Sequence, residues 1–264
     1  MKTSVAALIT PKLMLYTQTV EKLQALRLEG MKQALEEQRR QKEIVHLDFE
    51  ERLALLVQRQ WLWRENRGLA TRLKNAQLKM TASLEDLDYR PARGLKRAQI
   101  EQLRASAWVK EHRNCLVTGP TGCGKTYLAC ALGQQACREG YRTRYFYAPK
   151  FFRALDTARA DGSLLALLKS LARASVLILD DLGISNVSGK LFREFLEILD
   201  DRNGQGSTII TSQFPVSQWH EIIGDATVAD AILDRLVHNA YRLELKGESL
   251  RKSKTDPSEK EDSS

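Results

Sequence analysis

Residues 119–126 carry the pattern most directly tied to a chemical task. They match G-x-x-x-x-G-K-[ST] and read Gly119-Pro120-Thr121-Gly122-Cys123-Gly124-Lys125-Thr126. Glycines let such a loop turn its backbone N–H groups toward phosphate oxygens, and a following helix adds the positive end of its dipole. We expect Lys125 to reach the β- and γ-phosphates and the Thr126 hydroxyl to bind Mg²⁺. The loop therefore predicts a site for ATP and Mg²⁺.

Two carboxylates follow a second apolar run, where Val176-Leu177-Ile178-Leu179 precedes Asp180 and Asp181. A buried parallel strand is apolar on both faces, so its carboxylates stand where it emerges at its carboxyl end. We expect Asp180 to hold Mg²⁺ through water, and Asp181 to orient and deprotonate the attacking water. An Asp pair after a strand also caps helices, but downstream of a phosphate loop it favours ATP hydrolysis.

A third run, residues 208–213, also ends in polar side chains. If this strand lies between the two described above, its tip faces the γ-phosphate. Either Ser212 or Gln213 would then position the water, and the residue patterns do not choose between them. The alternative is turn chemistry before Pro215.

Arg235 lies on a predicted helix at residues 229–238, directly after Asp234. Phosphoryl transfer requires an additional arginine for the charge that develops, and another subunit can supply it. We select Arg235 for this role. The competing interpretation is a surface ion pair with a neighbouring acid.

The surrounding elements must bring these motifs together. Short β-branched runs alternate with helical segments, which predicts a parallel α/β sheet with helices on both faces. The expected strands are residues 115–118, 143–147, 176–179, 208–211 and 241–245. We place this ATPase domain at residues 98–251 and a disordered tail at 252–264, where apolar anchors are lacking.

A small all-α domain is expected upstream, at residues 1–80, followed by a linker at 81–97 that contains Pro91 and Gly94. Leucine stripes at helical spacing run from Leu23 to Leu35 and again from Leu53 to Leu69. Asp48 with Glu51 three residues later predicts a capping box that opens the second of these helices.

A basic stretch of that helix, residues 59–79, holds a single acid, Glu65, and includes Trp61 and Trp63. Cationic side chains on a helix can neutralise phosphates and release counterions independently of sequence. The alternative is a solvated face whose tryptophans pack in the domain core. We expect contact with duplex DNA through Arg59, Arg64, Arg67, Arg72 and Lys74.

Composition narrows the classes of protein that remain. The 264 residues include 41 Lys plus Arg and 33 Asp plus Glu, a net charge of +8 that permits a polyanionic partner. No apolar run is long enough for a membrane helix, and residues 1–10 lack a signal sequence, so we expect a cytoplasmic protein without membrane contact. The four cysteines form no C-x-x-C pair and are interpreted as buried packing residues, with a redox or metal role as the alternative.

Together these residues resemble the IstB-type ATPases, AAA+ helpers of insertion-sequence transposases and relatives of the DnaC helicase loaders. Beyond the nucleotide motifs, the resemblance rests on segments spread over almost the whole chain. They read Leu26-Arg27-Leu28-Glu29-Gly30-Met31, Phe49-Glu50-Glu51-Arg52-Leu53, Leu84-Glu85-Asp86-Leu87-Asp88-Tyr89-Arg90, Leu233-Asp234-Arg235-Leu236-Val237-His238 and Lys246-Gly247-Glu248-Ser249-Leu250-Arg251.

The resemblance implies a P-loop AAA+ core with a five-stranded sheet in the order 5-1-4-3-2. It also implies ATP-dependent assembly of a homo-oligomer on duplex DNA and recruitment of a DDE-type transposase. Arg235 takes the arginine-finger position, and Arg251 is a candidate second phosphate sensor. Few residues follow the fifth strand, so we expect no helical lid and a pocket that a neighbouring subunit completes.

Two rival functions stay open. The same core could load a replicative helicase, as the DnaC-like relatives do, and a phosphate loop alone would also permit a small-molecule kinase. Asp181 and the basic helix argue against the kinase, because a water-activating carboxylate suits hydrolysis.

Overall fold

A computed structural model describes residues 11–185 and 187–249, and the chain divides between Ala70 and Thr71 into two compact units. The first unit is helical. It contains α1 (Pro11–Ala25), α2 (Glu29–Arg40), a 3₁₀ helix (Lys42–His46) and the first part of α3 (Phe49–Ala76), whose last turns belong to the second unit. The predicted domain limits of 1–80 and 81–97 remain a proposal.

The capping box before α3 is confirmed. The backbone N–H of Glu51 donates to Oδ1 of Asp48 at 2.8 Å, and the N–H of Asp48 donates to Oε2 of Glu51 at 3.0 Å. Each side chain thereby satisfies a backbone donor that the first helical turn leaves without a partner. These reciprocal bonds fix the start of α3 at Phe49.

The leucine stripes of the helical unit do not form a hydrophobic core. Leu26 is 66% exposed, Phe49 76% and Trp61 58%. Gly30 lets α2 approach α3 closely, because a Cβ there would lie 2.8 Å from the Cα of Gln60. Gln60 also accepts a hydrogen bond from the N–H of Met31 at 3.1 Å. Close backbone packing and polar contacts therefore hold these helices together.

The second unit is built on a five-stranded sheet in which every neighbouring pair is parallel. Its strands lie in the order β2-β3-β4-β1-β5, which confirms the predicted order read from the other edge. All five strands occupy the expected segments: β1 (Asn114–Thr118), β2 (Thr143–Tyr147), β3 (Val176–Leu182), β4 (Ser207–Ser212) and β5 (Ala240–Glu244).

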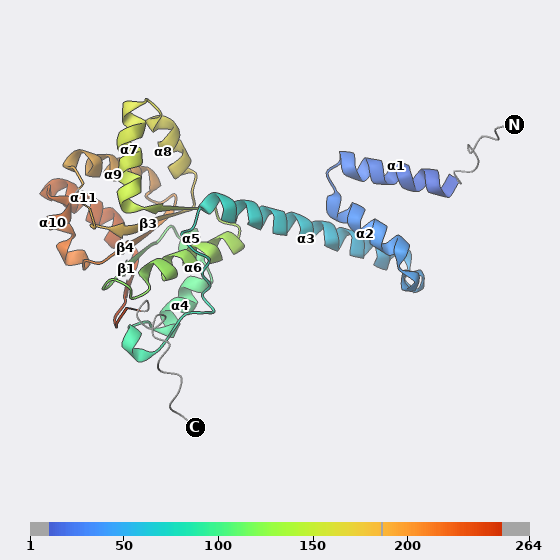
Figure 1. Ribbon diagram of the computed structural model, residues 1–264, viewed down its shortest axis with the longest axis horizontal. Coiled ribbons are helices and arrows are strands. Elements are labelled where there is room, and N and C mark those ends of the chain that lie inside the picture. The colour runs from blue at the N-terminus through green and yellow to red at the C-terminus, as the bar shows by residue number, and fades with distance from the viewer. Residues whose placement is uncertain (1–10, 186, 250–264) are drawn as a thin grey trace, which may run out of the picture. The chain divides into compact units, whose positions relative to one another are not determined.

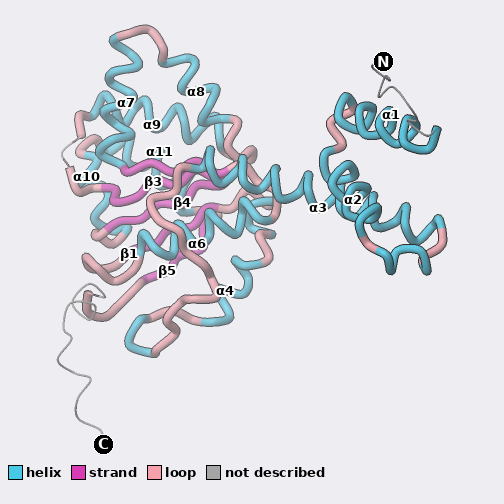
Figure 2. Tube along the Cα trace, turned by 45° about the vertical axis from the view of Figure 1, so that its right-hand side comes forward, coloured by secondary structure: helices cyan, strands magenta, loops and turns pink. Residues whose placement is uncertain are grey.

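Helices cover both faces of this sheet, as expected for a parallel α/β fold (Figures 1 and 2). Besides two 3₁₀ helices (Pro91–Arg93 and Val216–Gln218), they are α4 (Arg97–Arg104), α5 (Ala107–Lys110), α6 (Lys125–Arg138), α7 (Ala148–Ala160), α8 (Leu164–Ala172), α9 (Gly189–Arg202), α10 (Trp219–Ile223) and α11 (Ala226–Val237). The sheet and these helices form the P-loop core that the sequence predicts.

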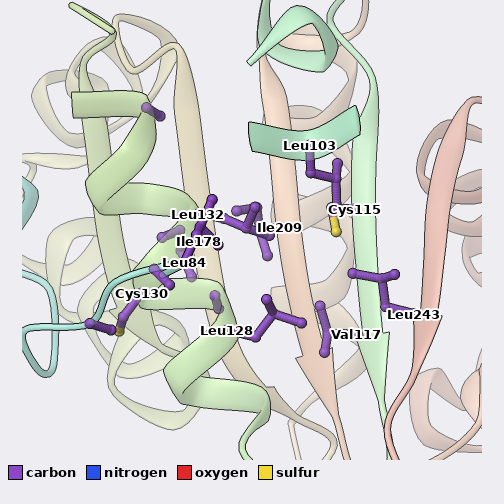
Figure 3. Close-up of a cluster of buried hydrophobic side chains, with 14 of the residues drawn as sticks. Leu84, Leu103, Cys115, Val117, Leu128, Cys130, Leu132, Ile178, Ile209 and Leu243 are labelled. Carbon is purple, nitrogen blue, oxygen red and sulfur yellow. The ribbon is translucent and has the colours of Figure 1, made fainter. Parts of the chain in front are cut away.

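Side-chain alternation explains the two layers. Cys115 and Val117 of β1 face α6 in one cluster, whereas Leu116 between them points to the cluster built with α7, α9 and α11. Figure 3 shows the first cluster, where Leu128 and Leu132 of α6 lie over the sheet. Because each central strand is apolar on both faces, the polar residues that do chemistry are confined to the strand ends.

The four cysteines, Cys115, Cys123, Cys130 and Cys137, are buried and reduced, which confirms the packing interpretation. Burial raises the pKa of the Cys115 thiol to about 12, so this sulfur stays protonated and inert. Within the described residues, no helix is both long and apolar enough to cross a membrane.

Candidate nucleotide site

The phosphate loop connects β1 to α6, the context in which such a loop binds phosphates. Gly119, Gly122 and Gly124 adopt φ values of 144°, 82° and 97°. Only glycine reaches this region without strain, so these positions let the chain fold tightly before α6 begins at Lys125. The loop therefore presents the N-terminus of a long helix at the carboxyl end of the sheet.

Lys125 is 5% exposed and folds over its own loop. Its ammonium group donates to the carbonyl oxygens of Gly119 at 2.7 Å and Pro120 at 2.9 Å. The cation thus lies within the loop that would surround a triphosphate. A phosphate oxygen is a stronger acceptor for an ammonium group than a neutral carbonyl, so these bonds are exchangeable for phosphate contacts.

Thr126 and Asp180 meet directly, although 54 positions separate them in the chain. The Thr126 hydroxyl lies 3.0 Å from both carboxylate oxygens of Asp180. A hydroxyl beside a carboxylate is an oxygen donor set that suits Mg²⁺. The structure therefore brings the two predicted metal-binding residues together, and their chemistry fits that cation.

Asp180 is fully buried and is held by further donors. The Tyr145 hydroxyl donates to Oδ2 at 2.7 Å, and the Thr211 hydroxyl donates to Oδ1 at 2.7 Å. Lys79, on the segment after α3, places its Nζ 3.5 Å from Oδ2. Burial, followed by the bond to Asp180, raises the pKa of Tyr145, which keeps its hydroxyl protonated as a donor.

Asp181 has an unusual backbone for a residue with a side chain, with φ at 64°. The pairing of β3 with β4 shifts register between Leu179 and Leu182, and the Asp181 N–H donates instead to the Thr211 hydroxyl at 2.8 Å. Positive φ is uncommon at residues other than glycine, although aspartate adopts it more readily than most side chains. This kink turns Asp181 into the lining of the nucleotide cavity.

The end of β4 distinguishes between Ser212 and Gln213. The Ser212 hydroxyl is buried and donates to the carbonyl of Leu182 at 2.8 Å, while its own carbonyl accepts from the Gly119 N–H at 3.3 Å. Gln213 lines the cavity and accepts a hydrogen bond from the Thr121 hydroxyl at 2.7 Å. Of the two side chains, only that of Gln213 faces the space where a nucleotide would lie.

These groups surround one cavity of about 1190 Å³. Its lining includes residues 121–128, the end of β2 at residues 145–147, and Leu87, Leu95 and Leu245, which add apolar surface. The volume and the mixture of cationic, carboxylate and apolar groups suit a nucleoside triphosphate. The chain beyond β5 also contacts the loop, because a Cβ on Gly122 would collide with Ser249.

Arg235 lies away from this cavity. Its carbonyl accepts from Nδ2 of Asn114 at 2.8 Å, so it sits near the amino end of β1, whereas the phosphate loop follows the carboxyl end. Four residue steps along a strand span about 13 Å. The guanidinium forms an ion pair with Asp200 of α9 and is 30% exposed. Within one chain the structure does not bring Arg235 to the nucleotide site.

The residues expected to bind DNA differ in their surroundings. Arg64 and Lys74 are exposed, Arg67 lies 5.0 Å above the Trp63 ring, and Arg59 pairs with Glu37. The Nε of Arg72 donates to the carbonyl of Cys137 at 2.8 Å, near the end of α6. Arg72 thus has a structural contact in addition to any contact with a phosphate. Arg251 lies outside the described residues.

Several residues that contact the candidate site could not be selected from the sequence. Tyr145 stands in an aromatic run that reads as core, and Lys79 follows a long helix that already contains many cations. Arg93 is buried and donates to the carbonyl of Cys123 within the phosphate loop. Thr211 had a usable signal, because it precedes the predicted polar strand end by one residue.

Comparison with known proteins now identifies the family. The family model described as IstB-like ATP binding protein matches residues 21–258. The chain belongs to this family. An insertion sequence ATP-binding protein of Sinorhizobium fredii is 48% identical over 240 residues, covering 91% of this chain and 98% of the relative.

The fold comparison agrees with this family. The crystal structure of DnaI superposes with a TM-score of 0.54 at 26% identity and covers 64% of this chain and 96% of DnaI. The DnaC helicase loader gives a TM-score of 0.50 at 23% identity, covering 62% and 97% of the two chains. The core of this IstB-like protein therefore shares its fold with DnaI and with the DnaC helicase loader.

Proposed function

We propose that this IstB-like protein is an ATPase that assembles on duplex DNA and assists a DDE-type transposase in moving an insertion sequence. The contact of Thr126 with Asp180, 3.0 Å apart and next to Asp181, carries the proposal for hydrolysis. Nucleotide binding needs the loop alone, whereas hydrolysis also needs a group that orients the attacking water, and the Asp181 carboxylate can both orient that water and accept its proton.

Each residue of the site has a defined task in this proposal. Residues 119–126 bind the phosphates, with the Lys125 ammonium exchanging the carbonyls of Gly119 and Pro120 for phosphate oxygens. Thr126 and Asp180 would hold Mg²⁺, which neutralises phosphate charge. Asp181 accepts the proton of the attacking water, and the Gln213 amide orients that water from the neighbouring strand.

Arg235 supplies transition-state charge to a neighbouring subunit. Its position near the amino end of β1 keeps Arg235 away from the nucleotide site of its own chain, but does not keep it from the site of another copy. The ion pair with Asp200 must then open as subunits associate, because the guanidinium has to exchange one acidic partner for phosphate.

The helical unit supports assembly. Large apolar side chains at its surface, including Leu15, Leu26, Phe49 and Trp61, are more than half exposed. Exposed apolar side chains of this size, where they gather on one surface, mark sites of protein association. The cations of α3, Arg64 and Arg67 among them, provide phosphate contacts in the same unit.

The transposase as partner rests on the relatives, one of which is named as an insertion sequence ATP-binding protein. The likeness to DnaC shows a shared fold, and helicase loading remains the alternative. Both functions use ATP-dependent assembly on DNA. They differ in the protein that is recruited.

Two measurements test the proposal. ATP turnover by the full chain should rise when duplex DNA is added, and Lys125→Ala should abolish turnover and ATP-dependent assembly while the circular dichroism spectrum is retained. The second measurement is retention of the transposase of the same insertion sequence on immobilised duplex, compared with retention of the host replicative helicase. Absence of turnover with and without DNA would refute the ATPase, and retention of the helicase alone would favour the loader.

A further inference from the structure

A second cavity, of about 770 Å³, lies at the opposite end of the sheet from the phosphate loop. It is bordered by the start of β2, the end of α8 and the last turns of α3, and we call it the basic groove. Its cationic residues are Arg72, Arg142, Arg144, Lys169 and Arg173. Among the described residues that line it there is no acid, and the neutral members are small or polar.

The cations of the basic groove lie close together without a neighbouring carboxylate among the described lining residues. Arg90, Arg104, Arg193 and other arginines of the second unit pair with carboxylates. No ion pair is found in the described part of the chain for Arg142, Lys169 or Arg173, all three of which are exposed. Like charges that converge without counterions repel one another and cost stability, so their grouping requires another explanation.

Helix capping explains only part of the cluster. Arg72 bonds to the carbonyl of Cys137 near the end of α6, and Lys169 lies in the last turn of α8, where a cation meets the negative end of the helix dipole. Arg173 is the C-cap residue of the same helix. Arg142 and Arg144 flank the first residue of β2 and serve no helix end, although the Arg144 guanidinium also lies 5.6 Å from the centre of the Phe146 ring. An anionic ligand accounts for all five cations.

The lining also indicates which anion. Single-stranded nucleic acid is held by stacking on aromatic rings, and no aromatic residue is among the described residues of the groove. Arginine, lysine, threonine, serine and asparagine side chains are the groups that contact the phosphates of a duplex.

We propose that the basic groove binds the sugar–phosphate backbone of duplex DNA, independently of base sequence. The inference rests on the proposed function in one respect, namely that the protein binds DNA. It adds a contact surface on the second unit that does not include the cations of α3 at residues 59–67. Because the groove lies at the amino end of β2, its occupant leaves the phosphate loop untouched.

The test uses the full-length chain with the triple substitution Arg142→Gln, Lys169→Gln and Arg173→Gln. A matched control, Arg153→Gln, Lys190→Gln and Arg242→Gln, removes the same charge from exposed positions outside the groove. Binding to unrelated duplexes is measured with ATP at several salt concentrations. The groove variant should bind at least 10-fold more weakly, and its dependence of log K on log salt should flatten by up to roughly 0.9 for each of the lost phosphate contacts.

The Tm of thermal unfolding is a second measurement. If the three cations stabilised the fold, their removal would lower the Tm, whereas our proposal expects it to rise. Removing unpaired like charges should raise the Tm of the groove variant at low salt by up to about 4 °C, with ATP affinity unchanged. A fall in Tm, or equal loss of DNA binding in the control, would overturn the inference. So would a larger loss for a single strand than for the duplex.

The two proposals fail in different ways. If the unaltered chain binds no duplex in any nucleotide state, the proposal that the protein binds DNA is wrong. The proposal that the groove binds DNA is then wrong as well. If the unaltered chain binds duplex and the groove variant binds equally well with the same salt dependence, only the groove is wrong.

Discussion

Lys79 Nζ lies 3.5 Å from Oδ2 of Asp180, so a cation from the segment after α3 already meets the carboxylate that we propose for Mg²⁺. The same ammonium group is 5.4 Å from the centre of the Tyr147 ring. Lys79 and a metal ion would therefore compensate the same negative charge. When either cation is bound, the Asp180 carboxylate attracts the other one more weakly.

Lys79→Met should lower the Mg²⁺ concentration needed for ATP binding. Lys79 is 41% exposed, so solvent screens the attraction, and the expected change is at most about fivefold. Mg²⁺ titrations of fluorescent nucleotide binding measure it. Lys150→Met is the control, because Lys150 lines the same cavity and has no ion pair with Asp180 in the described part of the chain. A raised Mg²⁺ requirement in Lys79→Met would contradict the competition.

Asp181→Asn should bind ATP with Mg²⁺ normally and hydrolyse it about 100-fold more slowly, because an amide cannot accept the proton of the water. Asparagine is the substitution of choice, since it tolerates the φ of 64° better than alanine does. Single-turnover rates and nucleotide affinity separate the two effects. Turnover close to that of the unaltered chain would show that another group is the base.

Arg235→Ala should bind ATP normally but hydrolyse it poorly, because its own phosphate loop is intact. Mixing it with Lys125→Ala joins an intact loop on one subunit to an intact Arg235 on its neighbour. Turnover of the mixture should then exceed the sum of the separate variants. If the two variants form mixed oligomers and no turnover returns, the role of Arg235 in a neighbouring site is disproved.

Asp200→Asn provides a second test of the same arginine. It removes one of the two acids that pair with Arg235 within its own chain, the other being Asp234 at 3.7 Å. Association should then need a lower protein concentration, since the ion pair no longer competes with the neighbouring site. Analytical ultracentrifugation with ATP measures the change, and Asp201→Asn is a control on the adjacent exposed residue.

The cations of α3 give an independent prediction for DNA. Replacing Arg64 and Arg67 with glutamine should weaken binding about equally for unrelated duplexes, and flatten the salt dependence by up to roughly 0.9 per lost phosphate contact. Arg72 is left unchanged because its bond to Cys137 would confuse loss of contact with loss of stability. An unchanged salt dependence would show that Arg64 and Arg67 contact no phosphates and belong to a solvated helix face.

The sequence predicted the sheet well because its signals are local. Apolar runs such as residues 176–179 must be buried on both faces, and polar residues directly after them mark the strand ends. The glycine spacing of residues 119–126 requires a tight turn before a helix. These two patterns were sufficient to place Thr126 and Asp180 at the same edge of the sheet.

Contacts that depend on distant surroundings could not be predicted. Tyr145 has the composition of a core residue, and only the packing of β2 against β3 shows that its hydroxyl meets Asp180. Leu26 and Leu53 lie in two separate predicted apolar stripes, yet both side chains are exposed. Helical spacing tells which side chains share a face, but not what covers that face.

The opposite placement of the phosphate loop and Arg235, at the two ends of β1, dictates how copies of the chain would join. If Arg235 completes the site of a neighbour, each subunit donates from one surface and accepts at another, so the contact is head-to-tail and not two-fold symmetric. Unless such an array closes into a ring, its two ends are chemically unlike. One end exposes a nucleotide site without its arginine, and the other an arginine without a site. A partner that binds only one of these two ends would therefore always meet the array in the same orientation along the DNA.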